Sequence, residues 1–233
     1  MLLVLLALPA FAASVGDPGP DPAVGRLRLV GAVELEEIWV ADRDCEGDLG
    51  CDAVDRYSFT GGEVQVALVH GLAVLGSLGR IRDQVSEADF DAAGIGWGLG
   101  VKGALPLSRV WWLHGQARLD HGLPADQGPG AENGSRLALT GTAGLAWGAI
   151  EGGFAGHVGV QRALFWQQEL RPLGDDGLEI SLQPSWPGSV AGGFSWASQP
   201  LGSSWGNAPR MVLSLDARAG QSTGVTAQLG LAF

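Results

Sequence analysis

The sequence predicts an all-β fold: an antiparallel transmembrane up-and-down β-barrel of about ten strands, with about eight or twelve as the alternatives. Four observations predict it. Apolar residues alternate with small or charged ones over most of the chain, which places successive side chains on opposite faces of a strand. The small-residue face also carries charges in mid-strand, and aromatic residues gather near strand ends. Short and long connections alternate between the expected strands.

The first residues indicate export. Leu2 to Leu6 form a short apolar run, and the small residues Ala10 and Ala12 flank Phe11, as signal peptidase requires. No Lys or Arg precedes the run, so an ordinary apolar N-terminus is the alternative. Neither this run nor any later segment approaches the roughly 18–20 apolar residues of a membrane helix. We interpret residues 1–12 as a signal peptide, 13–25 as a short linker and 26–233 as one barrel domain.

Composition narrows the class of protein. The chain is 46% hydrophobic and 17% charged, with 38 Gly and nine Trp, a combination that is rare in soluble domains. The net charge of −11 argues against nucleic-acid binding, because that function needs basic patches to replace counterions on phosphate.

The alternation is clearest over 94–102. Ile95, Trp97 and Leu99 share one face there, while glycines and Lys102 share the other. The pattern recurs over 27–36, 137–147 and 211–218. The expected strands span about 26–40, 57–70, 72–82, 93–104, 109–121, 135–148, 152–167, 178–187, 209–218 and 223–233. Residues 190–197 could form one more strand within the weakly patterned stretch 188–208.

The connections follow the rhythm of short periplasmic turns and long outer loops. The tight ones are His70-Gly71, 106–108 and 149–151, and the long polar ones are 41–56, 82–92, 122–134 and 168–177. The aromatic residues expected in girdles at the two membrane–water interfaces are Trp39, Tyr57, Trp111, Trp112, Trp147, Trp166, Trp186 and Trp196.

The last strand places Val225, Ala227, Leu229, Leu231 and the terminal Phe233 on one face. Behind a signal peptide, this segment resembles the closing strand of bacterial outer-membrane β-barrels, which ends in Phe and is read by the barrel-assembly machinery. The segment 178–186 also resembles a strand of autotransporter-like barrels.

This resemblance implies a location in the Gram-negative outer membrane, with outer-membrane lipid and the barrel-assembly machinery as partners. It implies that Leu229, Leu231 and Phe233 form the assembly signal. It transfers no active site, and we expect no cofactor.

The first long loop holds the two cysteines, Cys45 and Cys51, which predict a disulfide in an exported protein. The spacing of acidic residues in the same loop resembles the first positions of a calcium-binding loop. However, Ala53 stands at the position of the bidentate Glu. A solvated acidic loop is the favoured interpretation, and no metal is expected. The weak calcium ligands would be Asp42, Asp44, Glu46 and Asp48.

Charged residues in mid-strand project onto the inferred lumen, where they either line a polar pore or pair to fill a narrow barrel. The interior of a small barrel is barely wider than its own side chains, which favours filling. His114 and His157 share this polar face, so we expect hydrogen bonding there and not hydrolase chemistry. The expected lumen charges are Arg28, Glu34, Glu36, Glu63, Lys102, Arg118, Asp120, Glu179, Asp216 and Arg218.

The sequence therefore predicts a small outer-membrane barrel with a largely filled lumen and surface-exposed loops, in a structural or interaction role and not an enzyme. A narrow porin for small solutes is the alternative. A lipid-modifying enzyme and a soluble secreted β-sandwich are the further possibilities.

Overall fold

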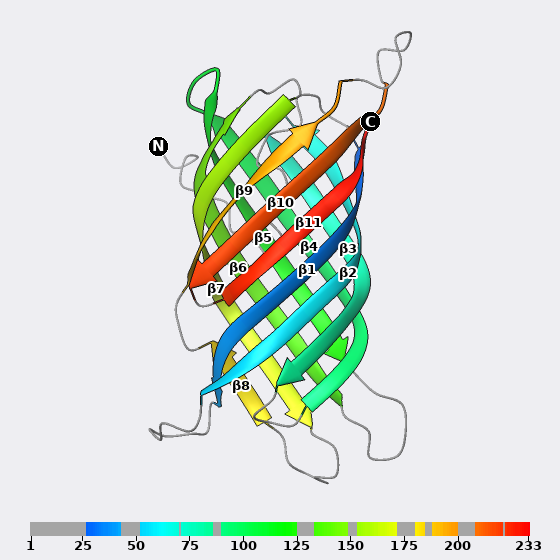
Figure 1. Cartoon of the computed structure of the whole chain (residues 1–233), viewed down its shortest axis with the longest axis vertical. Coiled ribbons are helices and arrows are strands. Elements are labelled where there is room, and N and C mark those ends of the chain that lie inside the picture. The colour runs from blue at the N-terminus through cyan, green and yellow to red at the C-terminus, as the bar shows by residue number, and fades with distance from the viewer. Residues whose placement is uncertain are drawn as a thin grey trace.

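A computed structural model of the chain describes residues 27–42, 52–69, 71–85, 90–124, 133–148, 153–171, 180–184, 188–199, 208–220 and 222–233. These residues form a single antiparallel sheet that closes on itself into a barrel (Figure 1). Within this part of the chain no helix is long and apolar enough to cross a membrane. The expected signal peptide and linker lie outside the described residues, as do Cys45 and Cys51.

Ten strands close the barrel. Strands β1 to β7 pair in sequence, β7 pairs with β9, and β9 continues through β10 and β11 back to β1. At the seam the backbone amide of Phe233 donates to the carbonyl of Leu27 at 2.8 Å. The strands are β1 Leu27–Asp42, β2 Asp52–Val69, β3 Leu72–Val85, β4 Phe90–Pro106, β5 Trp111–Pro124, β6 Asn133–Gly148, β7 Gly153–Arg171, β8 Ile180–Pro184, β9 Ser189–Ala197, β10 Arg210–Gly220 and β11 Ser222–Ala232.

The strand count of ten is confirmed, but one member differs from the expectation. Residues 178–187 were expected to form a full barrel strand, and the part of this range that the structure describes is the five-residue strand β8. Its place in the ring is taken by β9, the segment that the sequence left as a possible additional strand. It pairs with β7 from Gly153 to Gln161 and with β10 on its other side.

The short strand β8 changes the width of the barrel along its axis. Its Leu182 lies opposite Gln168 of β7 and Asp42 of β1, so β8 bridges these two strands at one end. We call this the narrow end, and the end with Leu27 and Phe233 the wide end. Figure 1 shows β8 beyond the ends of β10 and β11.

At the narrow end the ring consists of β1 to β7 and β8, which makes eight strands where the wide end has ten. The strands β9, β10 and β11 have 9, 11 and 11 residues, close to the minimum that crosses a bilayer. They end before reaching the narrow end, whereas β1 to β7 continue past them. Since barrel diameter grows with strand number, the lumen tapers toward the narrow end.

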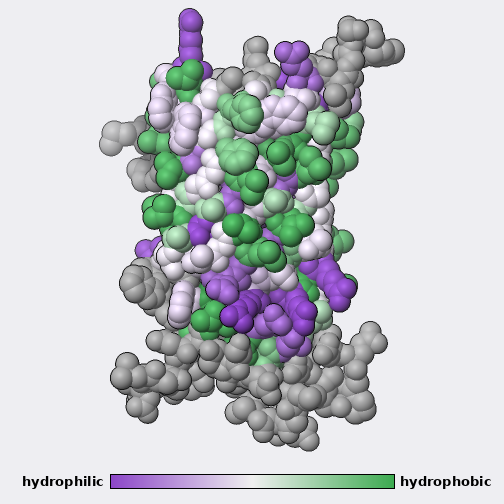
Figure 2. Space-filling view, in the orientation of Figure 1, coloured by the Kyte–Doolittle hydropathy of each residue, from purple (hydrophilic) through white to green (hydrophobic). Residues whose placement is uncertain are grey.

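The two faces of the sheet follow the predicted alternation. Ile95 and Leu99 point outward with 63% and 58% of their surface exposed, while Lys102 of the same strand is buried inside. Figure 2 shows hydrophobic residues over the middle of the barrel and a band of hydrophilic residues next to the narrow end. The outer surface is thus apolar where a bilayer would contact it and polar beyond.

The expected aromatic girdles are only partly formed. Trp39, Trp111 and Trp147 are exposed on the outside. Trp112 and Trp166 were expected there and are instead buried inside the barrel. Trp112 follows Trp111 directly, and adjacent residues of a strand point to opposite faces. Tyr57 also faces inward, Trp196 is half-buried, and Trp186 lies outside the described residues.

The predicted rhythm of connections also needs correction. The tight turn between β2 and β3 is confirmed, with Gly71 at a φ of 78° that favours glycine. The loops expected over 41–56 and 82–92 are much shorter, because the strands around them extend to Asp42, Asp52, Val85 and Phe90. The expected order of short and long connections does not hold at the end of the chain. There Gln221 alone separates β10 from β11, where a long connection was due.

The interior of the narrow end holds an apolar cluster, with the buried carboxylates Asp55 and Asp83 beside it. An inward-facing cluster there consists of Ile38, Val40, Val85, Phe90, Ala92, Ala138 and Trp166, with Tyr57 and Ala163 packed against it. Val40 and Val85 have no exposed surface at all. The eight-stranded ring therefore encloses a packed core and not a water-filled mouth.

Candidate functional site

The charged lumen predicted from the sequence is present. Every expected lumen residue that the structure describes faces the interior, and most are less than a tenth exposed. They are Arg28, Glu34, Glu36, Glu63, Lys102, Arg118, Asp120, Asp216 and Arg218. Glu179 lies outside the described residues. These side chains come from strands β1, β2, β4, β5 and β10, and they meet in clusters around individual arginines.

The first cluster surrounds Arg118 of β5. Its Nη1 donates to Oε2 of Glu63 on β2 at 3.1 Å, and its Nε donates to Oδ1 of Asp120 at 2.6 Å. Its Nη2 donates to the hydroxyl of Ser77 on β3 at 2.5 Å. One guanidinium thus links three strands, and charge-assisted bonds of this kind are about twice as strong as neutral ones.

The cluster continues toward the wide end. The amide of Gln65 donates to Glu63 at 2.8 Å, and the ammonium of Lys102 donates to the carbonyl oxygen of Gln65 at 3.4 Å. Room for Arg118 comes from the small face of β4, because a Cβ on Gly98 would lie 2.7 Å from Nε of Arg118. The inward glycines of β4 therefore make space for the ion pairs, as the alternation predicts.

The second cluster surrounds Arg218 of β10. Its two terminal nitrogens pair with Glu34 and with Glu36 of β1, the latter at 3.1 Å. Its Nη2 also donates to the hydroxyl of Thr226 on β11 at 3.0 Å. Since β11 stands between β10 and β1 in the sheet, this arginine reaches across the seam strand from the inside.

The third cluster was missed by the sequence prediction. Arg136 of β6 lies between the rings of Tyr57 and Trp166, with its Cζ 4.1 and 4.3 Å from their centroids. Its Nη1 is 3.7 Å from Asp55, whose other partner is the amide of Gln168 at 3.0 Å. The further carboxylates around Arg136 are Glu36 at 3.8 Å and Asp83 at 4.0 Å.

A signal for this cluster exists in the sequence. Arg136 shares the face of Ala138 and Thr140, which the alternation assigns to the lumen. Asp55 and Asp83 were placed in loops, because the expected strands began at 57 and ended at 82. The actual strands are longer and bring both carboxylates inside, where they have no exposed surface.

Two histidines lie on the lumen face that the alternation assigns to them. His114 and His157 are buried in the lumen with their rings 5.5 Å apart, edge to face. Nε2 of His157 lies 3.0 Å from Oδ1 of Asp216 on β10. His121, in contrast, packs against Trp97 with the ring centroids 5.5 Å apart. His70 lies outside the described residues.

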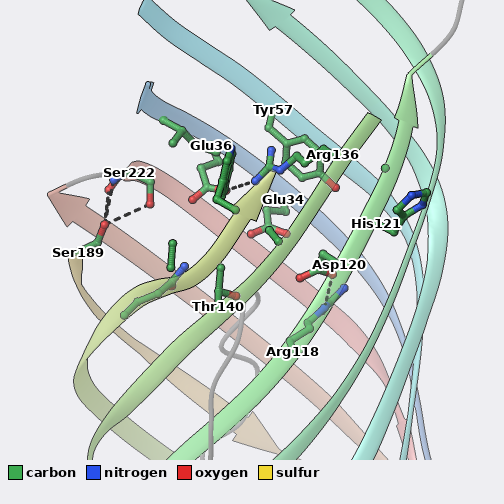
Figure 3. A pocket seen from close by; sticks show the side chains of 16 residues that line it. Glu34, Glu36, Tyr57, Arg118, Asp120, His121, Arg136, Thr140, Ser189 and Ser222 are labelled. Carbon is green, nitrogen blue, oxygen red and sulfur yellow. Dashed lines mark hydrogen bonds and ion pairs between the residues drawn. The ribbon is translucent and has the colours of Figure 1, made fainter. Parts of the chain in front are cut away.

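The space left between these clusters is small. Figure 3 shows a cavity whose charged lining residues are Glu34, Glu36, Arg118, Asp120 and Arg136. Its volume is about 30 Å³, which holds one or two water molecules. Arginines and carboxylates point into this space from strands on several sides. The charges around Arg118 and Arg218 thus pair with one another across the barrel.

The loop candidates remain predictions. The side chains of Asp42, Asp44, Glu46 and Asp48 lie outside the described part of the chain, as do both cysteines. Among the residues that the structure does describe, no three His, Cys, Asp or Glu side chains converge in a way that could hold a metal ion.

Comparisons with known proteins give structural neighbours and no sequence family. No protein-family model matches the chain, and no curated protein does. The translocator domain of autotransporter NalP from Neisseria meningitidis matches 91% of this chain and 88% of its own, at 13% identity and a TM-score of 0.48. The TodX deltaS2S3 mutant monoaromatic hydrocarbon channel matches 96% of each chain, at 8% identity and a TM-score of 0.34.

The CymD monoaromatic hydrocarbon channel matches 90% of this chain and 87% of its own, at 9% identity and a TM-score of 0.28. Likenesses this remote carry no argument about function. The evidence for the architecture is in the chain itself: a closed antiparallel sheet of ten strands, apolar outside and charged inside. That is the architecture of an outer-membrane β-barrel.

Proposed function

We propose that this protein is a small outer-membrane barrel with a closed lumen, which acts through its outer surface and loops in a structural or interaction role at the cell envelope. The observation that carries the proposal is the narrow end. There eight strands enclose a packed apolar core, directly beside the Arg136 cluster. A solute on that path would have to displace both.

The outer face supports the proposed location in the membrane. Large apolar side chains are exposed around the barrel, among them Leu78 at 64% and Phe154 at 69%. A surface of this kind is unfavourable in water and is covered by hydrocarbon when the barrel is inserted. Lipid and the barrel-assembly machinery are therefore the partners that we propose, the latter through the strand that ends at Phe233.

A narrow porin is the second candidate, since charged side chains line the lumen of porins as well. The small cavity and the mutual pairing of the lumen charges favour the closed barrel over it. An enzymatic role is not part of the proposal. The imidazoles of His114 and His157 are buried inside the barrel, whereas a lipid-modifying site would have to face the lipid.

The experiment is single-channel recording in planar bilayers with the purified protein. We expect little or no steady conductance from the wild type, and new conductance from Arg118→Ala or Glu34→Ala if loss of the pair opens a water path. Heat-modifiable migration on a denaturing gel serves as the control for insertion. Large, stable wild-type channels with salt-dependent conductance would make this protein a porin. Recovery in the soluble periplasmic fraction, with identical migration before and after boiling, would refute the membrane location.

A further inference from the structure

An apolar groove runs across the outside of the barrel over β11, β1, β2, β3 and β4. We call it the outer groove. Its volume is about 780 Å³, within the range of small-ligand sites. The outward-facing Gly31, Gly62 and Gly76 carry no side chain and form its open floor, and Leu78, Trp97 and Leu99 stand along its side. Gly31 lies opposite Gly62, so the depression continues from β1 to β2, and the residues opposite Gly62 and Gly76 on the next strands are Leu78 and Leu99, which border it.

A positively charged side chain lies at one edge of this groove. Arg80 is the next outward residue after Leu78 on β3, toward the narrow end, and its side chain is exposed. Residues two apart on a strand are about 7 Å from each other, so the guanidinium reaches the rim of the groove. The residues opposite Arg80 are Thr60 on β2 and Ile95 on β4, and neither carries a charge.

The neighbouring outward arginines show what Arg80 lacks. Arg82 holds both oxygens of Asp91 at 2.7 and 2.6 Å, and Arg56 holds Glu37 at 2.8 Å. No carboxylate within the described ranges lies in salt-bridge distance of Arg80. A guanidinium is always charged and matches the oxygens of a phosphate with paired N–H donors. Arg80 lies at the border between apolar and polar surface. An anionic group of a membrane lipid would supply the negative charge that the neighbouring residues do not.

We infer that the outer groove and Arg80 together bind one phosphate-bearing lipid. An acyl chain lies along the glycines of the groove, and the phosphate oxygens accept hydrogen bonds from Arg80 and from the hydroxyl of Thr60. This inference rests on the membrane location proposed above and names the lipid chemistry that the surface selects. The groove supplies the apolar contact, and the arginine discriminates a phosphate from an uncharged headgroup.

Native mass spectrometry of the purified barrel in detergent, with added dioleoylphosphatidylglycerol, tests the inference. The wild type should retain one lipid, and dioleoylglycerol, which lacks the phosphate, should be retained much less. Arg80→Gln should weaken retention about tenfold, the effect of losing one charged hydrogen bond. Arg162→Gln is the matched control, because Arg162 is also outward and exposed but lies on β7, outside the groove. It should bind like the wild type.

A second variant tests the groove itself. A Cβ on Gly62 would meet only the carbonyl of Val30, at 3.8 Å, so Gly62→Leu fits and fills the groove. It should lose the lipid while keeping heat-modifiable migration. Arg80→Lys keeps the charge, and its lipid retention should lie between those of the wild type and Arg80→Gln. This variant tests the role of Arg80 even if Arg80→Gln folds poorly. Wild type without bound lipid, or equal retention by wild type, Arg80→Gln and Gly62→Leu, would overturn the inference. A barrel that inserts but binds no lipid leaves the proposed function intact, whereas one that never inserts contradicts it.

Discussion

Arg118 on β5 and Glu63 on β2 meet inside the barrel, with Nη1 of the arginine 3.1 Å from Oε2 of the glutamate and both side chains at most 4% exposed. They are 55 residues apart in sequence and belong to strands separated by β3 and β4 in the sheet. The pair therefore ties one wall of the barrel to another. This kind of contact distinguishes a filled barrel from an open one.

Breaking this pair should destabilise the barrel strongly. Arg118→Ala leaves Glu63 and Asp120 buried without their cation, which costs about 3–5 kcal/mol in comparable cases. The measurement is urea-induced unfolding of the protein in lipid vesicles. Arg56→Ala is the control, because the Arg56–Glu37 pair is more than half exposed and should contribute about 0–1 kcal/mol. Similar losses for the two variants would contradict the role that we give to burial.

The inward glycines of β4 should be intolerant of a side chain. A Cβ on Gly98 would stand within 2.8 Å of two guanidinium nitrogens of Arg118, so Gly98→Ala must displace the ion pair. We expect a loss of about 1–3 kcal/mol, as for other overpacked interiors. Gly76→Ala is the comparison, since its Cβ would meet only Leu99 at 3.7 Å and the carbonyl oxygen of Gly98 at 3.9 Å, both ordinary contacts. In the same unfolding assay, Gly98→Ala should have a clearly lower free energy of unfolding than Gly76→Ala. The reverse order would rule out the steric argument.

The end of the chain should matter for assembly. Phe233 is outward and 41% exposed, and its amide is bonded to Leu27 across the seam. Deleting Phe233 should reduce the yield of heat-modifiable protein in the membrane fraction, because the closing strand loses its recognition residue. Phe154→Ala removes an equally apolar outward side chain, 69% exposed, and should leave the yield unchanged. Equal yields for the deletion and the wild type would dismiss the assigned role of Phe233.

The two cysteines should be bonded in protein from the oxidising envelope. A disulfide between Cys45 and Cys51 closes a short ring and should add roughly 2–3 kcal/mol by restricting the unfolded chain. Thiol titration of native, unreduced protein measures this directly. No free thiol is the expected result, and two free thiols would disprove the bond.

The sequence predicted which residues of each strand face the lumen and which face outward. Once a strand is located, the period of two assigns every residue in it to one face. The prediction failed where the period was ignored. Trp112 and Trp166 were assigned to the outside by residue type, although Trp112 cannot share a face with Trp111. Arg136 was overlooked even though its phase places it in the lumen.

The narrow end could not be predicted in the same way. β9 contains Gly192 and Gly193, which weaken its alternation, while the sequence alternates well over β8, which has five residues. The pairing of β8 with β1 joins segments more than a hundred residues apart. No local pattern reports such a contact, so neither the taper nor the apolar core that it encloses follows from the sequence.

The position of β8 also means that the sheet is closed twice. β1 is paired with β11 from Arg28 to Ile38, and then with β8 from Val40 to Asp42. Strands β9, β10 and β11 can therefore separate from β1 while β7, β8 and β1 still hold the other end as a ring. Loss of structure should begin at this three-strand segment, and amide exchange should be faster there than in β2 to β6. The barrel would then behave as two cooperative units, although its sheet is continuous.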